Sequence, residues 1–280
     1  MNCPVCNSPE TRVIANSFEF SKLYPEFTYL NCGECENIAI LPPLSNSDMG
    51  QGYIREFTFS EPKLNPSIVK RVKKFITKYS LFQRSSVYDI GAGNCQYSMA
   101  FKSLGFNSVA VDVERLNPYY SPFVYFGDLN AALDVKESHI FFSNHSFEHI
   151  DLSDLSRLCN LIASRMREPS VGVFVVPIAK RNLVRRGIYL EEFVYGHKNL
   201  FSKTSAEFFF KKQFPERLNL KVVIDSPKTR FAFLRTRLQI FSKYLKDGFY
   251  AKALILACYL VISLIFGAEE ELWISIQNSA

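Results

Sequence analysis

Four of the seven cysteines form two Cys-x-x-Cys pairs near the N-terminus. The first pair is Cys3 and Cys6, the second is Cys32 and Cys35, and 25 residues separate the pairs. Two residues between thiolates let both sulfurs of a tight turn point at one ion, and two such turns supply the four ligands of a tetrahedral Zn²⁺. Redox-active pairs are the alternative, but they need a thioredoxin-like βαβ context that the sequence around residue 3 lacks. The spacing therefore predicts a zinc ribbon.

A carboxylate and a glycine turn form a second group of residues suited to chemistry. Asp89 lies near the end of an apolar run that reads as a buried strand, and Gly91 and Gly93 follow it before a predicted helix. Such a turn lets the backbone approach a ligand closely. A dinucleotide-binding turn would carry a third glycine where Gln96 stands, so an NAD site is disfavoured. Asp112, 23 residues after Asp89 at the end of the next predicted strand, can accept hydrogen bonds from both hydroxyls of a ribose.

This pattern, followed by Gly127 and Asp128, resembles the class I S-adenosylmethionine (SAM)-dependent methyltransferases over about residues 83–225 and the last strand. The resemblance implies that the glycine turn lines the methionine part of SAM, that Asp112 holds the ribose, and that Asp128 with Leu129 borders the adenine. The cofactor-binding residues that it implies are Asp89, Gly91, Gly93, Asn94, Asp112, Val113, Asp128, Leu129 and Asn144. The alternative role for Asp89 is that of a structural carboxylate that stabilises the turn, and the alternative role for Asp128 is that of a helix N-cap.

One position departs from the family pattern. The family often has DxGxGxG, but Cys95 stands here at the last glycine position. The larger side chain is expected to narrow the room for the methionine part of SAM. Cys95 is also the sequence feature that supports an alternative function, a non-catalytic zinc adaptor on a degenerate methyltransferase core.

Two further segments are similar to parts of the family that lie near the methyl group and the acceptor, residues 141–150 and residues 196–210. Transfer to a sugar hydroxyl needs a group that accepts the hydroxyl proton, and a neutral imidazole suits this task near neutral pH. His145 and His197 fall in these segments and are the predicted catalytic residues. Glu148 and His149 are interpreted equally as helix-capping or supporting residues and as residues that take part in the reaction. Methyl transfer needs no metal, so the zinc is expected to be structural.

The acceptor is predicted from a looser resemblance. A zinc ribbon before such a domain resembles bacterial methyltransferases of sugar and cell-surface glycan biosynthesis, which implies a sugar or glycan acceptor, with lipid-linked precursors included. An rRNA base methyltransferase with the ribbon as RNA reader is the alternative. Residues 1–45 contain only Arg12 and Lys22 as basic residues against five glutamates, whereas RNA binding needs clustered Lys and Arg. A nucleic-acid partner is therefore not expected.

The elements that must position these residues alternate between short apolar runs and helical stretches from Ser86 onward. This alternation predicts a Rossmann-like, doubly wound α/β fold with a mostly parallel seven-stranded sheet. The predicted strands cover residues 86–90, 108–113, 123–126, 139–143, 171–177, 218–225 and 272–277. The predicted regions are a zinc ribbon (1–45), a linker and packing helix (46–82), the SAM-binding core (83–225), a basic and apolar helical insertion (226–268) and the last core strand (269–280).

The insertion carries the charge imbalance of the chain. Between Ser226 and Lys252 seven basic residues face one acidic residue, a difference of +6 that equals the net charge of the whole chain. Apolar residues at helical spacing in its first half predict a basic amphipathic helix, and they are Phe231, Leu234, Leu238, Phe241 and Leu245. Any anionic partner should meet this segment first, and peripheral contact with an anionic membrane is one expectation.

The second half of the insertion, Ala253–Ala268, is an uncharged run of 16 residues. A bilayer-spanning helix needs about 20 apolar residues, so this run is short for a span. Three interpretations stay open: a helix buried against its own protein or a second subunit, as in a homodimer; a helix in contact with a membrane surface; or a true span. Met1–Pro9 lacks the pattern of a secretory leader, so a cytoplasmic location is expected, with the inner membrane surface as the alternative.

Composition and length limit the class of protein and the number of domains. With 48% hydrophobic and 15% aromatic residues against 21% charged residues, the chain has ample material for a core, and intrinsic disorder is excluded. With 280 residues it is long enough for one α/β domain of ordinary size and a small additional unit.

Overall fold

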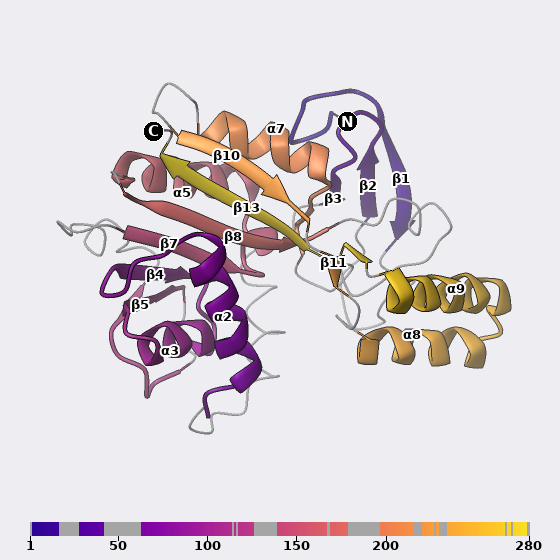
Figure 1. Ribbon diagram of the computed structural model, residues 1–280. Coiled ribbons are helices and arrows are strands. Elements are labelled where there is room, and N and C mark those ends of the chain that lie inside the picture. Colours follow the sequence, from indigo (N-terminus) through magenta and orange to yellow (C-terminus); the bar gives the residue numbers. More distant parts are fainter. Residues whose placement is uncertain are drawn as a thin grey trace.

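A computed structural model of the chain describes the following residues: 2–16, 28–41, 63–113, 115, 117–125, 139–166, 169–178, 197–214, 220–226, 228–229, 234–266, 268–269 and 271–278. Its centre is a seven-stranded sheet in the order β10-β13-β8-β7-β4-β5-β6 (Figure 1). The predicted doubly wound, mostly parallel sheet is confirmed.

The parallel part of the sheet contains five strands. They are β4 (Ser86–Ile90), β5 (Asn107–Asp112), β6 (Phe123–Tyr125), β7 (His139–Asn144) and β8 (Val171–Pro177). The last strand, β13 (Glu271–Asn278), runs antiparallel between β8 and β10 (Leu220–Asp225). The predicted strand positions agree with these bounds to within two residues at each end.

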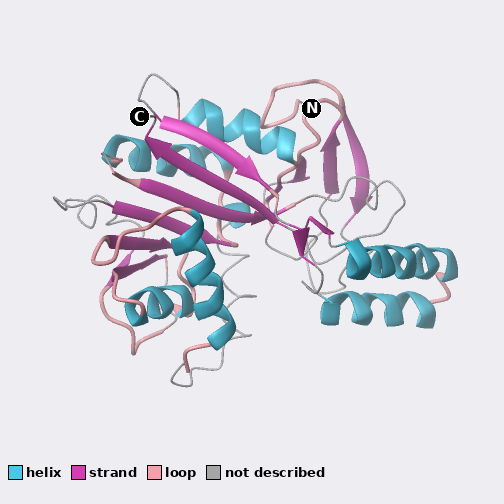
Figure 2. Cartoon of the chain, viewed as in Figure 1, coloured by secondary structure: helices cyan, strands magenta, loops and turns pink. Residues whose placement is uncertain are grey.

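Helices cover both faces of the sheet (Figure 2). On one face, α2 (Pro66–Lys78) and α3 (Gln96–Ser103) bury Val72, Phe75 and Phe101 against Val87 and Phe142 of the strands. The predicted packing helix is present as α2, and the side chain of its N-cap residue Asn65 accepts a hydrogen bond from the Ser67 amide.

On the other face, α5 (Leu152–Arg165) and α7 (Lys203–Gln213) pack on the second set of strand side chains. Tyr88 and Ile90 belong to this cluster, whereas Val87 belongs to the first one. Side chains therefore alternate between two buried faces, which is why every residue of β4 is buried instead of every second one.

A separate small sheet lies at the N-terminal end. It has the order β1-β2-β3-β9, with β1 (Thr11–Asn16), β2 (Thr28–Cys32) and β3 (Ile38–Leu41) from the N-terminal region. Its fourth strand, β9 (Asn199–Leu200), comes from the other end of the core segment and pairs antiparallel with β3. No sequence pattern indicates this pairing, because β9 has only two residues.

The insertion folds as a helical hairpin of α8 (Leu234–Lys246) and α9 (Tyr250–Phe266), joined to the core by the short strands β11 (Lys228–Thr229) and β12 (Ala268–Glu269). Both predicted helices are present, although Phe231 lies outside the described residues. None of the helices in the described part of the chain has the length and apolarity to cross a membrane. Residues 46–62 of the predicted linker and packing helix also lie outside the described ranges.

Candidate active site

The register of the parallel strands brings three predicted site residues to one edge of the sheet. Asp89 is paired with Ala110 in β5 and with Phe142 in β7. Two residues further along each chain, at the carboxyl ends of these strands, come Gly91, Asp112 and Asn144. In open α/β sheets, ligands bind in the crevice outside the carboxyl ends of the strands. These three predicted cofactor residues therefore lie where open α/β sheets place a ligand.

The glycine turn has a different constraint at each glycine. Gly91 has φ +71°, and a Cβ there would lie 2.2 Å from the Ser146 hydroxyl, which donates a hydrogen bond to the Gly91 carbonyl at 2.9 Å. Gly93 has φ +51°, and no described atom comes within 4 Å of the position of a Cβ. Gly91 is thus needed for close packing against Ser146. Gly93 leaves open space beside the turn, as backbone contact with a ligand requires.

Asp112 fixes the turn from the neighbouring strand. Its Oδ2 accepts a hydrogen bond from the Gly93 amide at 2.7 Å, and its Oδ1 accepts one from the Val113 amide at 2.7 Å. The carboxylate is half-buried, and a carboxylate oxygen can accept more than one hydrogen bond. The Val113 side chain beside it is 70% exposed, an apolar surface that the described part of the chain leaves uncovered.

Asn144 presents an unsatisfied polar atom at the same edge. Its Oδ1 is buried and has no hydrogen-bond partner among the described residues. An uncompensated buried acceptor costs about 1–3 kcal/mol, so a ligand that donates to this oxygen would gain by satisfying it.

Asp89 faces the interior of the domain. Its Oδ2 accepts hydrogen bonds from the Ser98 amide at 2.9 Å and from the Ser98 hydroxyl at 2.6 Å, which caps the N-terminus of α3. Burial raises the pKa of Asp89 to about 7, and the charge of Asp112 acts in the same direction. This geometry fits the structural alternative for Asp89.

Cys95 occupies the N-cap of α3 with φ +62°, the left-handed region that glycine adopts without steric cost. This conformation explains why a glycine is common at the position. The thiol is buried against Ala110 and Tyr120, and burial raises its pKa to about 12, so it is neutral. Asp128 and Leu129 lie outside the described residues.

A buried asparagine that no sequence pattern indicates contacts the glycine turn at the exposed Asn94. The buried Asn117 donates a hydrogen bond from Nδ2 to the Asn94 carbonyl at 3.1 Å. It follows β5 at a distance of five residues, within a stretch that has no periodic pattern. No signal in a single sequence distinguishes it from a solvent-exposed loop asparagine.

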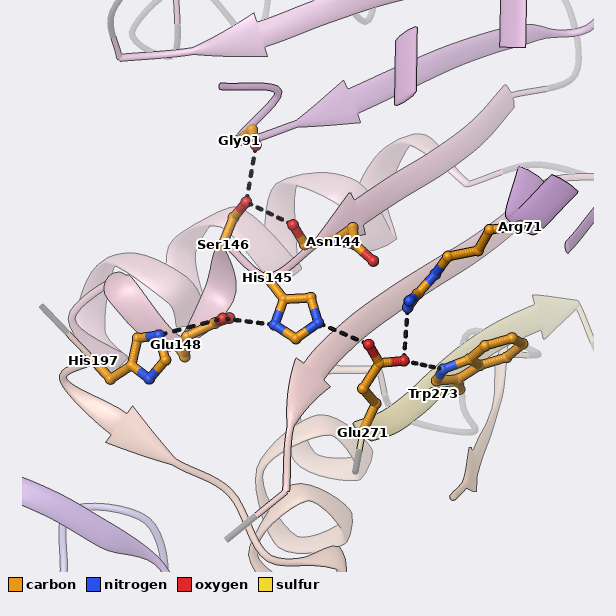
Figure 3. A network of polar contacts seen from close by, with 9 residues as sticks. All are labelled: Arg71, Gly91, Asn144, His145, Ser146, Glu148, His197, Glu271 and Trp273. Carbon is orange, nitrogen blue, oxygen red and sulfur yellow. Dashed lines mark hydrogen bonds and ion pairs between the residues drawn. The ribbon is translucent and has the colours of Figure 1, made fainter. Parts of the chain in front are cut away.

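A network of charged side chains lies next to this edge, around His145 (Figure 3). Nε2 of His145 lies 2.9 Å from a Glu271 oxygen, and Nδ1 lies 3.5 Å from a Glu148 oxygen. Glu271 also binds Arg71 at 2.6 Å and accepts a hydrogen bond from the Trp273 indole at 3.1 Å. His145 has φ +54°, a strained conformation that its surroundings must impose.

The two carboxylates hold His145 in its charged form. Burial alone would lower the pKa of His145, but Glu148 and Glu271 raise it to about 9. Burial would likewise raise the pKa of Glu271, but His145 and Arg71 lower it to about 2. The pKa of the buried Glu148 is also lowered, because the effect of His145 and the neighbouring histidines exceeds that of burial. At neutral pH His145 is therefore an imidazolium between two carboxylates.

His197 approaches the network from a separate segment. Its Nε2 lies 3.8 Å from the same Glu148 oxygen, and its ring packs edge-on against His149 with 4.6 Å between centroids. Neither oxygen of Glu148 has a hydrogen-bond partner within the described ranges, so ion pairs alone compensate its buried charge. The structure thus brings His145 and His197 to opposite sides of one carboxylate.

Backbone contacts keep His197 in place. The Lys198 amide donates to the Glu148 carbonyl at 2.8 Å, and the Lys198 ammonium binds Asp151 at 2.6 Å. The Asn199 side chain donates to the Ile150 carbonyl at 3.0 Å. β9 of the small sheet begins at Asn199, so His197 lies two residues before the strand that pairs with the N-terminal unit.

The four predicted metal ligands lie together. The Sγ atoms of Cys3 and Cys35 are 3.6 Å apart, as are those of Cys6 and Cys32, and all four lie within 4.8 Å of one another. A disulfide would need about 2.05 Å. Thiolates at about 2.3 Å from a tetrahedral ion lie about 3.8 Å apart. The cluster therefore has the dimensions of a four-cysteine metal site.

The core contacts this cluster directly. The Ser202 hydroxyl, which caps α7, donates a hydrogen bond at 2.7 Å to the carbonyl of Cys35. One serine thus connects a turn of the cysteine cluster to the helix that follows β9.

We predict that His145 makes stability fall as pH rises from about 6.5 to 9. A group whose pKa is higher in the folded state than in the unfolded state stabilises the fold fully below the unfolded pKa, and this stabilisation is lost as pH rises through the folded pKa. The expected loss is about 2–3 kcal/mol, measured by urea unfolding at pH 6, 7.5 and 9. His145→Gln should be less stable at pH 6 and should lose this part of the pH dependence. An equal slope in both proteins would contradict the assignment.

The comparisons with known proteins concern the fold. No family model and no curated protein matches the sequence. Among solved structures, the plantazolicin methyltransferase BamL, in complex with a triazolic desmethylPZN analogue and SAH, superposes with a TM-score of 0.52 at 13% identity, over 84% of this chain and 91% of that one. A SAM dependent methyltransferase from Archaeoglobus fulgidus gives a TM-score of 0.48 at 16% identity, over 75% of this chain and 94% of that one. The chain has the Rossmann-like fold of SAM-dependent methyltransferases.

Proposed function

We propose that this protein is a SAM-dependent methyltransferase that acts on a hydroxyl group of a glycan or of its lipid-linked precursor. The observation that carries the proposal is the row formed by Gly91, Asp112 and Asn144 at the carboxyl edge of the sheet, in a domain with the methyltransferase fold.

The residues at this edge fit SAM. Asp112 would hold the ribose hydroxyls, and the exposed Val113 would lie against the adenine. The open space at Gly93 would admit the methionine part, and the unsatisfied Oδ1 of Asn144 would accept a hydrogen bond from its ammonium group. Cys95 keeps its side chain packed behind the turn, which supports a competent site rather than a degenerate one.

When bound, SAM supplies an electrophilic methyl group on a sulfonium. The protein must place an acceptor oxygen in line with that methyl group and exclude water. The hydroxyl proton has to leave at or after attack, and we propose that the imidazole of His197 accepts it, with Glu148 stabilising the resulting imidazolium. His145 is less suited to this role, because a pKa of about 9 keeps it protonated at neutral pH.

The four cysteines would hold a structural Zn²⁺. A small ribbon cannot bury enough apolar surface to fold without such a centre. In this protein the ion would also stabilise the sheet that contains β9, and hence the position of His197. The metal has no part in the transfer itself.

The function is tested by incubating the protein with SAM carrying a tritiated methyl group and three acceptor pools: nucleotide sugars, extracted lipid-linked saccharides, and rRNA. Label is expected in a saccharide pool. Label in rRNA alone would overturn the glycan assignment. Binding of SAM without transfer to any pool would favour an adaptor role.

His197→Gln is predicted to lower kcat by about 100-fold or more, because general-base catalysis contributes factors of this size. Glu148→Gln should lower kcat by a smaller factor and shift the pH profile of kcat, while SAM binding stays intact in both. Activity of His197→Gln within threefold of the wild type would contradict the base assignment.

Cys35→Ser is predicted to lose the bound zinc, measured as metal per chain by mass spectrometry, and to lower kcat through displacement of His197. Cys258→Ser provides the matched control for the metal content, because Cys258 is exposed and lies far from the cluster in sequence. Retention of one zinc ion in Cys35→Ser would show that these cysteines do not form the site.

A further inference from the structure

The hairpin of α8 and α9 lies beyond the seven-stranded sheet (Figure 1). Its two helices share a small core, in which Leu256 and Leu260 of α9 pack with Phe241 and Tyr244 of α8. The solvent-exposed face of a surface helix normally carries polar side chains. In this hairpin, several of the exposed side chains are apolar.

Apolar side chains are exposed on both helices of the hairpin and in the turn between them. On α9, Tyr250, Leu254, Cys258 and Val261 recur at helical spacing and form one stripe, and all four are exposed. Leu238 and Leu245 are exposed on α8, and Phe249 is 50% exposed in the turn between the helices. Large apolar side chains gathered in this way mark an interaction surface.

Positive charge surrounds the turn between the helices. Lys243 and Lys246 are exposed near the end of α8, and Lys252 lies near the start of α9, with its ammonium 5.2 Å from the centre of the Phe249 ring. Asp247 is the one acidic residue of the hairpin sequence. Exposed aromatic rings next to lysines suit the interface of an anionic bilayer, where rings enter the headgroup layer and lysines meet lipid phosphates.

The same charges argue against a second copy of this chain as the partner. Self-association through the turn would bring two clusters of lysines together, and like charges brought together at an interface are unfavourable. An anionic surface compensates these lysines, whereas another copy repeats them.

The hairpin emerges from the edge of the sheet that carries the candidate active site. It leaves the core after β10, at Ser226, and returns at Glu271, the first residue of β13. Glu271 is paired with Pro177, the last residue of β8, so the hairpin begins and ends at the carboxyl edge of the parallel strands. The Glu271 carboxylate itself contacts His145.

We propose that the α8–α9 hairpin is a membrane-docking element that places the protein on an anionic bilayer through the turn at Phe249 and Tyr250 and the neighbouring lysines. The carboxyl edge of the sheet then faces the bilayer across the length of the hairpin, about 25 Å for the 17 residues of α9. Given the proposed function, the acceptor that this arrangement favours is the lipid-linked saccharide rather than a soluble nucleotide sugar.

The test is flotation of the full-length protein with vesicles of phosphatidylcholine alone or with 30% phosphatidylglycerol. Binding is expected to the anionic vesicles and to fall with salt. The double variant Lys243→Gln/Lys246→Gln should bind about 25-fold more weakly, at roughly fivefold for each lysine removed. Phe249→Ser/Tyr250→Ser should weaken binding about tenfold or more, because both rings lose their burial in the interface.

Matched controls come from α7. Phe208 is 56% exposed, close to the value for Phe249, and Lys211 and Lys212 are exposed neighbours of equal charge. Phe208→Ser and Lys211→Gln/Lys212→Gln should bind vesicles as the wild type does. Thermal unfolding of each variant shows whether the fold is retained.

Three results would overturn the proposal: no flotation with anionic vesicles, equal flotation of the hairpin variants and the wild type, or a dimer in sedimentation velocity that Phe249→Ser/Tyr250→Ser dissociates while no vesicles are bound. Flotation does not depend on methyl transfer, so a failure of docking and a failure of the proposed function are distinguished.

Discussion

The parallel register of β4, β5 and β7 is the constraint on which the candidate site depends. Asp89 is paired with Ala110 in β5 and with Phe142 in β7, so the three strands end side by side. The residues that follow these strands therefore meet at one edge of the sheet. A slip of one residue in either pairing would turn Asp112 or Asn144 to the opposite face. The buried apolar side chains on both faces of β4 resist such a slip, so the packing of the core also positions the polar residues of the site.

The buried charges around His145 join segments that are distant in sequence. Arg71 comes from α2, Glu271 from the last strand and Glu148 from the turn after β7. Removal of one partner from a buried ion pair leaves an uncompensated charge and costs about 3–5 kcal/mol. The network therefore favours one arrangement of these segments. It also connects the end of the hairpin at Glu271 and the segment of His197 to the edge where the proposed cofactor would lie. The burial of this network, the proposed zinc ion and the proposed membrane contact would then all affect the positions of its side chains.

The strands, the glycine turn and the four cysteines were predictable from sequence because each has a local pattern: apolar runs, Asp89 with its glycines, and the Cys-x-x-Cys spacing. For Asp89 the sequence left two roles open, and its contact with Ser98 favours the structural one. The proximity of Cys35 to Ser202 was not predictable, since it depends on how distant elements meet. The same holds for Glu271, which in sequence is the end of an acidic run before a strand. Its contact with His145 exists only because β13 inserts between β8 and β10.

The most direct test of the central claim is calorimetric titration of the protein with S-adenosylhomocysteine, for the wild type and for Asp112→Asn. Saturable binding at one site per chain is expected in the wild type, and about tenfold or greater weakening in Asp112→Asn, because one charged acceptor of the ribose hydroxyls is lost. Asp154→Asn on the exposed surface of α5 should bind as the wild type does. Absence of saturable binding in the wild type, or equal affinity in Asp112→Asn, would contradict a nucleoside site at this edge of the sheet.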